Sequence, residues 1–364
     1  MFQEQMDTPA VVVDLDILDA NLKRTAELAA KSGIKLRPHI KTHKSVWIAK
    51  KQLDYGAKGI TVAKLGEAEV MADGGIDDIL IAFPLVGSGK LKRLAALLRR
   101  GVHITVSVDS LEAARGISDV GTELGMQISL YLDINTGLNR CGLEPGQASA
   151  ELALAISALP GVAVTGLMTH AGHAYGCRDA ESAQKVAFEE AEGLIATQKI
   201  ITDRGVNVPE ISVGSTPTSK FAGQLSGVTE MRPGAYVFGD GSQLFPGLIT
   251  EEECAMRIYT TVISTPRPGY IIVDAGSKTL TNDASIHRSG YGYLPDYPEI
   301  MVERLSEEHG ILAVPDNCGL QIGDVVSLIP NHCCTVVNLR DELFGTRGGK
   351  LEQVLKIDAR GKNT

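Results

Sequence analysis

Residues 34–62 read IKLRPHIKTHKSVWIAKKQLDYGAKGITV and contain one strand–helix unit followed by the next strand. A short apolar run, Ile34 to Leu36, leads into a cationic segment over residues 37–44. A helical pattern, Lys44 to Tyr55, then precedes a second apolar run, Gly59 to Val62. Short β-branched runs that alternate with amphipathic stretches are typical of parallel βα units. This order predicts that more such units follow.

The same alternation continues over the next part of the chain. The predicted strands are Ile34 to Leu36, Gly59 to Val62, Asp78 to Phe83, His103 to Val108, Ile128 to Ile134, Val162 to Met168, Pro209 to Val213 and Met231 to Phe238. Helical patterns lie between most of them, at Lys44 to Tyr55, Leu65 to Asp73, Lys90 to Arg99, Glu151 to Ala158 and Ala180 to Arg204. Eight units within about 210 residues fit a (β/α)8 barrel of the TIM type better than an open sheet.

After about Leu244 the pattern changes to strand-like runs joined by Gly, Pro, Asn and Asp turns, with no convincing helix. These runs are Ile258 to Ser264, Tyr270 to Asp274, Glu299 to Val302, Gly310 to Val314, Val325 to Ile329, Cys334 to Leu339 and Lys350 to Ile357. An early strand, Asp7 to Asp14, could return to pair with them. We therefore expect a barrel over residues 15–244, and a mainly antiparallel β domain over residues 245–364 together with 1–14.

The composition of the 364 residues excludes several classes of protein. A net charge of −9 argues against nucleic-acid binding, which needs a basic surface. No apolar run approaches the roughly 20 residues that cross a bilayer. The segment Met1 to Thr8 is polar and acidic, unlike a signal peptide, and six irregularly spaced cysteines do not make a disulfide framework. We expect a cytoplasmic enzyme with neither a nucleic-acid nor a membrane partner.

The cationic segment holds two candidate catalytic lysines, Lys41 and Lys44, among the imidazoles of His39 and His43 and the guanidinium of Arg37. A lysine among other cations resists protonation, and its free amine can attack a carbonyl and hold an aldehyde cofactor as a Schiff base. A solvated basic loop is the alternative interpretation. The residues alone do not decide between the two lysines.

Unusual polar residues also follow the later strands, as expected for a barrel whose active site lies at the C-terminal strand ends. They are Asn135 to Arg140, Thr169 to Tyr175, Gly214 to Thr218 and Gly239 to Gly241. Each segment alone is compatible with ordinary turn chemistry. Together with the cationic segment they mark one rim of the barrel, which predicts an active site there.

Gly214, Ser215 and Thr216, with Gly239 and Asp240, have the composition of an anion site. Small residues let backbone N–H groups approach an anion, hydroxyls add donors, and a following helix N-terminus adds a favourable dipole. A simple helix cap at the first of these loops is the alternative. Loops after strands 7 and 8 commonly seat a phosphate, and strand 8 closes against strand 1. A lysine after strand 1 would face this cup, which is the layout that pyridoxal phosphate requires.

Four further loop residues are candidates for contacts with such a cofactor or with the substrate. Arg140 could hold the phenolate oxygen of the cofactor, with a surface arginine as the alternative. His170, His173 and Tyr175 could supply acid and base groups or stack on the pyridine ring. A structural role is the alternative for each of the three.

A second constellation, Pro330-Asn331-His332-Cys333-Cys334, lies in the predicted β domain. On a strand, residues two apart face the same way, so we expect His332 and Cys334 to share a face and Cys333 to point away. Imidazole and thiolate suit zinc, and two protein ligands leave positions for water or substrate. A buried cysteine pair beside an ordinary histidine is the alternative.

Over essentially the whole chain, these motifs resemble those of the fold-type III pyridoxal-phosphate enzymes of the D-threonine aldolase and D-serine dehydratase group, which are similar in fold to alanine racemase. The motifs that carry the resemblance are Arg37 to Lys44, Asn139 to Gly142, Gly214 to Thr218 and Pro330 to Cys334. The resemblance implies that Lys41, rather than Lys44, is the Schiff-base lysine. It also implies that His332 and Cys334 bind a divalent metal, which in turn would bind the β-hydroxyl of the substrate.

The catalytic candidates are Lys41, His170 and His173. The cofactor-binding candidates are Lys41, Arg140, Tyr175, Gly214, Ser215, Thr216, Tyr236, Gly239 and Asp240, and the metal candidates are His332 and Cys334.

The resemblance implies a lyase that acts on D-3-hydroxy amino acids and works as a homodimer. We expect retro-aldol cleavage to glycine and an aldehyde, with dehydration of D-serine or D-3-hydroxyaspartate to a 2-oxo acid and ammonia as the alternative. Some aldolases of the group carry Asp where this chain has Cys334, and a thiolate favours zinc over manganese or magnesium. An amino-acid racemase and a non-catalytic carrier of pyridoxal phosphate are the remaining alternatives.

Overall fold

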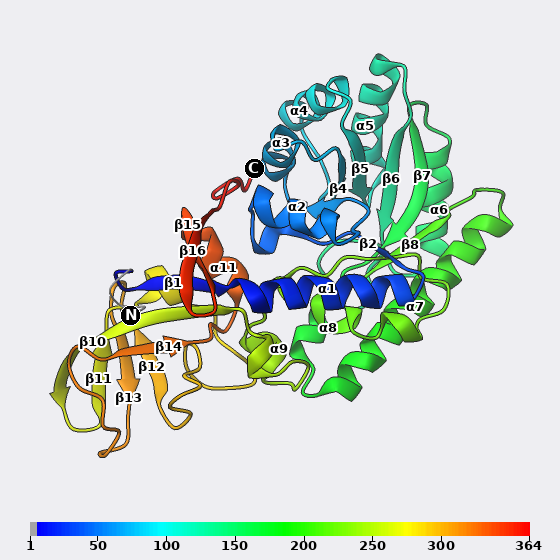
Figure 1. The fold of residues 1–364 in the computed structure, drawn as a ribbon. Helices are drawn as coiled ribbons and strands as arrows, with labels where there is room; N and C mark the ends of the chain where they lie inside the picture. The colour runs from blue at the N-terminus through cyan, green and yellow to red at the C-terminus, as the bar shows by residue number, and fades with distance from the viewer. Residues whose placement is uncertain (1–5) are drawn as a thin grey trace.

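Two eight-stranded sheets organise the computed structural model, which describes residues 6–364 (Figure 1). The first sheet forms a barrel, and the second lies beside it and contains both the N-terminal strand and the C-terminal strands. Residues 1–5 lie outside the described residues. They belong to two segments for which the sequence made predictions, Met1 to Thr8 and residues 1–14. No helix among the described residues is long and apolar enough to cross a membrane.

The barrel sheet is parallel throughout. Its strands are β2 (Lys35–Leu36), β3 (Ile60–Val62), β4 (Asp78–Ile81), β5 (His103–Val108), β6 (Ile128–Asp133), β7 (Val162–Met168), β8 (Glu210–Val213) and β9 (Glu230–Met231). The last strand pairs with the first through Lys35 opposite Glu230, and a parallel bridge between His39 and Thr61 joins the first strand to the second. The predicted (β/α)8 barrel is confirmed.

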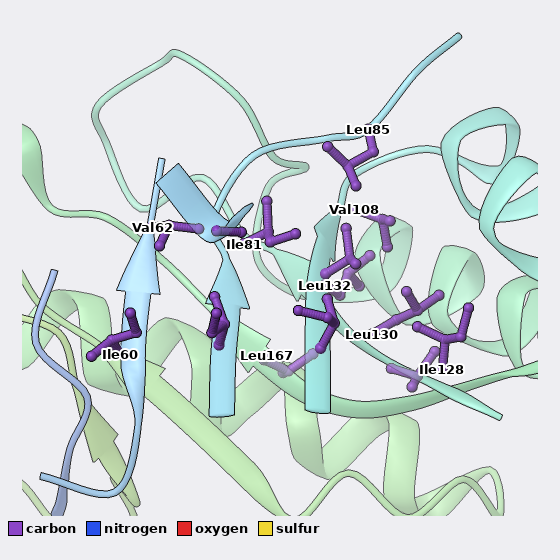
Figure 2. Packing of buried hydrophobic residues seen from close by; sticks show 14 of the residues in the cluster. Ile60, Val62, Ile81, Leu85, Val108, Ile128, Leu130, Leu132 and Leu167 are labelled. Carbon is purple, nitrogen blue, oxygen red and sulfur yellow. The ribbon is translucent and has the colours of Figure 1, made fainter. Parts of the chain in front are cut away.

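Helices cover the outside of the barrel and bury the apolar faces of the strands. They are α2 (Val46–Asp54), α3 (Leu65–Asp73), α4 (Ser88–Arg99), α5 (Leu111–Leu124), α6 (Gln147–Ser157) and α7 (Ala180–Asp203). Figure 2 shows side chains of this core, among them Val62, Ile81 and Leu132, which are fully buried. Burial of each such side chain contributes about 2 kcal/mol, so the packed strands give the site a rigid base.

The second sheet contains strands β1 (Ala10–Asp14), β10 (Met256–Arg267), β11 (Tyr270–Val273), β12 (Met301–Leu305), β13 (Gly310–Ala313), β14 (Val325–Leu328), β15 (Glu342–Arg347) and β16 (Lys350–Lys356). Its order is β12-β13-β11-β10-β1-β15-β16, with β14 also paired to β10. Every pair is antiparallel except β1 with β15. The predictions of a mainly antiparallel β domain and of an N-terminal strand paired within it are confirmed.

Helix α1 (Leu15–Lys31) connects the two sheets and lies between them in Figure 1. It begins after Asp14, whose side chain accepts hydrogen bonds from the first-turn backbone, as an N-cap residue does. Its buried residues Leu15, Leu18 and Leu22 pack into the core of the second sheet. The helix therefore holds barrel and sheet together, while the domain limits at residues 15 and 244 stay a prediction.

Two predicted strands near the site need correction: the first is shorter than predicted, and the second is a helix. The run Met231 to Phe238 ends as a strand at Met231, because Pro233 cannot donate to the ladder, and residues Ala235–Val237 form a 3-10 turn, η4. The run Cys334 to Leu339 is a helix, α11 (Cys333–Asn338). With α10 (Ser277–Leu280), this contradicts the expectation that the β domain has no helix.

The remaining short elements lie mostly in loops around the barrel rim. They are η1 (Ile40–Thr42), η2 (Gly172–Gly176), α8 (Thr216–Ser219), η3 (Ala222–Gln224), α9 (Gly241–Leu244) and η5 (Glu251–Glu253).

Candidate active site

A cavity of about 600 Å³ lies at the C-terminal ends of the barrel strands, where residues of the barrel loops and of the second domain meet. It brings together most of the predicted site residues. Its wall contains Lys41, Arg140, His170, His173, Tyr175, Ser215, Thr216, His332 and Cys334. A second cavity of about 340 Å³ adjoins it and shares Lys41, Arg140 and His170 with it, along with Gly214 on its own wall.

The structure separates the two candidate lysines. Lys41 lies on the turn η1, which begins after His39, and its side chain faces both cavities. No described residue makes a hydrogen bond or ion pair with its ammonium. Lys44 instead pairs with Glu67 at 3.0 Å, with both side chains buried, and also donates to Asn363. Geometry thus favours Lys41 as the free amine, independently of any resemblance.

Burial and neighbouring cations lower the pKa of the Lys41 amine. Burial is the main cause that lowers the pKa of Lys41, and the guanidinium groups of Arg140 and Arg232 lower it further. Nearby Cys334 and Glu67 oppose this shift only in part. A lysine in such a setting can act as a nucleophile or base near neutral pH.

The two predicted catalytic histidines differ in their availability. Burial, followed by the charge of Lys41, lowers the pKa of His170 to about 3, and its Nδ1 lies 3.3 Å from the carbonyl oxygen of Gly214. His170 is therefore a neutral imidazole that donates to this carbonyl and is a weak base. The Nδ1 atom of His173 is buried and has no hydrogen-bond partner among the described residues. His173 is the more available of the two.

The predicted phosphate cup lies on the same cavity as Lys41. Gly214 directly follows β8 and has a φ of +116°, which favours glycine, and Thr216 accepts a hydrogen bond from the Gly234 N–H at 3.1 Å. A Cβ on Gly234 would approach the Thr42 hydroxyl to 2.8 Å, so this position needs the small residue. The following helix α8 has only four residues, so the predicted dipole contributes little. Hydroxyls, small residues and the nearby amine together fit a phosphorylated aldehyde.

Three predicted cofactor residues lie behind the cavity wall, so the geometry does not support that role for them. The Tyr236 hydroxyl accepts a hydrogen bond from Gln52, and Gly239 packs against the backbone of Glu253. Asp240 is fully buried and contacts the metal candidate His332 instead. The chain forms the 3-10 turn Ala235–Val237 in place of a strand here, so Tyr236 and Asp240 are buried while Gly234, Ala235 and Ser242 line the cavity.

The predicted metal ligands meet on one short turn. His332 is the N-cap residue of α11 and Cys334 lies in its first turn, so the strand argument for their shared face was wrong although both line the cavity. Cys333 is buried in the second core. The Asp240 carboxylate lies 3.1 Å from the His332 Nδ1, which leaves Nε2 for a metal in the manner of many metal-binding histidines.

The surroundings of Cys334 favour the thiolate form of its side chain. A hydrogen bond from the Cys333 thiol and the neighbouring His332 hold the pKa of Cys334 well below its usual value. Its sulfur lies 3.2 Å from the Thr42 hydroxyl. Among residues 6–364 no group of three or more His, Cys, Asp and Glu side chains surrounds a metal position. His332 and Cys334 fit a metal that keeps open positions for substrate and water.

Several cavity residues were missed by the sequence analysis. Arg232 is buried, and its guanidinium donates to the Ser212 hydroxyl at 2.6 Å and to the Thr169 carbonyl. A charged residue inside the apolar run 231–238 was the available signal. The loop 283–287 also lines the cavity, and Asn331 holds it by donating to the carbonyl of Asp283 at 2.9 Å. This loop shows no sequence pattern that points to the site.

Comparison with known proteins identifies the family of the chain. Residues 13–242 match the alanine racemase N-terminal domain, and residues 255–346 match a putative serine dehydratase domain. The chain is 36% identical over 349 residues to D-threo-3-hydroxyaspartate dehydratase from Delftia sp. (strain HT23), covering 90% of this chain and 91% of that one. It is 31% identical over 361 residues to D-threonine aldolase from Arthrobacter sp., covering 98% and 93%.

Solved structures agree with these matches. The crystal structure of D-threonine aldolase from Filomicrobium marinum superposes with a TM-score of 0.90 at 32% identity, covering 98% of this chain and 96% of that one. The Delftia dehydratase superposes with a TM-score of 0.90 at 33% identity, covering 97% of each chain. Alanine racemase from Clostridium difficile 630, at 17% identity and a TM-score of 0.71, shares the fold alone.

The barrel, the second sheet and a free lysine beside a phosphate cup define a fold-type III pyridoxal-phosphate enzyme. The chain belongs to the aldolase and dehydratase family of these enzymes, in which an alanine racemase N-terminal domain is joined to a serine dehydratase domain. The interpretation as a non-catalytic carrier is therefore set aside.

Proposed function

We propose that this enzyme dehydrates a D-3-hydroxy amino acid to a 2-oxo acid and ammonia. One observation carries the proposal: the Cys334 sulfur contacts Thr42, the residue that follows Lys41. A base for the α-proton and a metal ligand for the β-hydroxyl thus lie on adjacent parts of one cavity. Elimination needs both functions at neighbouring carbons of the substrate, which is what this arrangement offers.

Pyridoxal phosphate, when bound, supplies an electron sink for the α-carbon. A divalent metal on His332 and Cys334 would supply Lewis acidity at the β-hydroxyl, and zinc suits the thiolate better than manganese or magnesium. Lys41 forms no ion pair with any described residue and its pKa is lowered, so it is placed to take a proton at Nζ. The guanidinium groups of Arg140 and Arg232 give the cavity a positive field for the substrate carboxylate.

The names of the relatives support this assignment. The Delftia relative is a dehydratase of D-threo-3-hydroxyaspartate. Its solved structures include a histidine-to-alanine variant, and a cysteine-to-alanine variant two positions further along that is in the metal-free form. His332 and Cys334 have the same spacing. A homodimer and a cytoplasmic location stay predictions from the sequence.

Retro-aldol cleavage, the reaction expected first from the sequence, is the second candidate. It needs a base for the proton of the β-hydroxyl, and the unpaired Nδ1 of His173 on the cavity wall favours this role. The D-threonine aldolases among the relatives also support it. A racemase would need neither metal ligand.

Product analysis distinguishes these reactions. The enzyme, loaded with pyridoxal phosphate and with zinc, manganese or magnesium, would be given D-threonine, D-serine and D-3-hydroxyaspartate. We expect a 2-oxo acid and ammonia in equal amounts and loss of activity when a chelator removes the metal. Formation of glycine and an aldehyde would contradict dehydration and identify aldol cleavage instead. Conversion to the L-amino acid that survives chelation would identify a racemase.

A further inference from the structure

Glu190 is a buried carboxyl group that none of the proposed chemistry uses. It lies on α7, directly behind the loop 214–218, and its side chain has no solvent exposure. Its Oε2 accepts a hydrogen bond from the Gly214 N–H at 3.2 Å. Its Oε1 is buried and has no hydrogen-bond partner among the described residues. Such an unsatisfied oxygen is costly and points to a role.

The carboxyl group connects to the phosphate cup through one threonine. The Thr218 side chain lies close enough to the Glu190 carboxyl group to lower its pKa. The Thr218 Oγ1 accepts from the Ser215 N–H at 3.1 Å and lies 3.3 Å from the Ser215 hydroxyl. Ser215 lines the cavity beside Lys41. Glu190 therefore contacts the backbone at the start of this loop and reaches its cavity-facing serine through a single hydroxyl.

The surroundings of Glu190 disfavour its ionised form. Burial raises the pKa of Glu190 to about 7, although the hydrogen bonds from Thr218 and Gly214 and the charge of Arg232 lower it in part. His170, whose Nδ1 lies 3.3 Å from the Gly214 carbonyl oxygen, is neutral and adds no charge at this loop. Arg232 is thus the cation that faces the carboxyl group from outside α7.

We propose that Glu190 is a positioning residue for the cofactor phosphate: as a neutral acid it holds the loop 214–218 in its binding arrangement, and its ionisation weakens the binding of pyridoxal phosphate. An ionised carboxylate behind the loop would repel the phosphate dianion, and the buried site screens this repulsion poorly. The inference rests on cofactor binding in this family and holds for dehydration and aldol cleavage alike.

The test measures the affinity of the apo-protein for pyridoxal phosphate by absorbance titration, from about pH 6 to about pH 8.5, on either side of the group's titration. Glu190→Gln keeps the shape and an acceptor for the Gly214 N–H but cannot ionise. Glu189→Gln is the matched control, because Glu189 is the neighbouring residue on α7 and makes an exposed ion pair with Lys185. A shared loss caused by the cofactor's own titration appears in all three proteins and cancels.

We expect the affinity for pyridoxal phosphate to fall as the pH rises, both in the wild type and in Glu189→Gln. This fall should be on the order of tenfold larger than the fall in Glu190→Gln. Equal pH dependence in all three proteins would overturn the inference and leave the proposed function standing. If the wild type did not bind pyridoxal phosphate at all, both the inference and the proposed function would be overturned. If Glu190→Gln does not fold, Thr218→Val replaces it: it should weaken binding at about pH 6, and unchanged affinity there would overturn the inference.

Discussion

Replacement of Lys44 by methionine should destabilise the protein strongly, whereas Lys41→Ala should not. Lys44 and Glu67 form an ion pair at 3.0 Å, with exposed side-chain fractions of 5% and 1%. Removal of one partner leaves a buried charge uncompensated, at a cost of about 3–5 kcal/mol. Glu67 keeps its hydrogen bonds from the N–H groups of Ala63 and Lys64, so we expect the lower end of that range.

The free energy of unfolding of the apo-protein, from urea titration, measures this effect. Lys41 has no ion partner within residues 6–364 and is desolvated, so Lys41→Ala should leave the unfolding free energy within about 1 kcal/mol of the wild type. The double variant Lys44→Met with Glu67→Gln removes both charges and should recover much of the loss. The reasoning would be refuted if Lys44→Met cost less than about 1 kcal/mol, or if Lys41→Ala cost as much as Lys44→Met.

Three further predictions concern residues in the cavity wall or directly behind it. Asp240→Asn should weaken metal binding by about 10–100-fold, because Asp240 orients His332, and competition with a chelating dye would measure this. Because burial raises the folded-state pKa of Glu190 to about 7, its stabilising contribution is complete below about pH 4.5 and lost as pH rises through 7. The unfolding free energy of the wild type relative to Glu190→Gln should thus fall by about 3 kcal/mol over that interval, and a flat difference would contradict the assignment. Gly234→Ala should weaken the binding of pyridoxal phosphate, measured by absorbance, because its Cβ would displace Thr42, whereas Gly89→Ala, in α4 with open space around it, should not.

The barrel was predictable because its strands are short β-branched runs with a strong local signal. Residues that follow such runs, for example Lys41, Arg140 and Ser215, could be assigned to one rim because a parallel barrel places all C-terminal strand ends together. The positions of Lys41 and of Lys44 relative to the cavity could not be derived this way. They depend on Glu67 and Asn363, which lie far from the lysines in the sequence.

The sequence predictions failed where tertiary packing overrode the local secondary-structure propensity. Val336 and Val337 made the segment after His332 look like a strand, but both are buried against the second core as a helix. The roles assigned to Tyr236 and Asp240 assumed a strand up to residue 238, so its early end moved them behind the cavity wall. Contacts between the two domains decide these positions, and a sequence pattern does not contain them.

Chemical trapping of the cofactor tests the central claim most directly. The protein would be loaded with pyridoxal phosphate, reduced with borohydride, digested, and its peptides identified by mass spectrometry. We predict a stable pyridoxyl label on Lys41, and none on that site in Lys41→Ala. A label on Lys44, or a Lys41→Ala protein that still forms the reducible adduct, would contradict the account of the site.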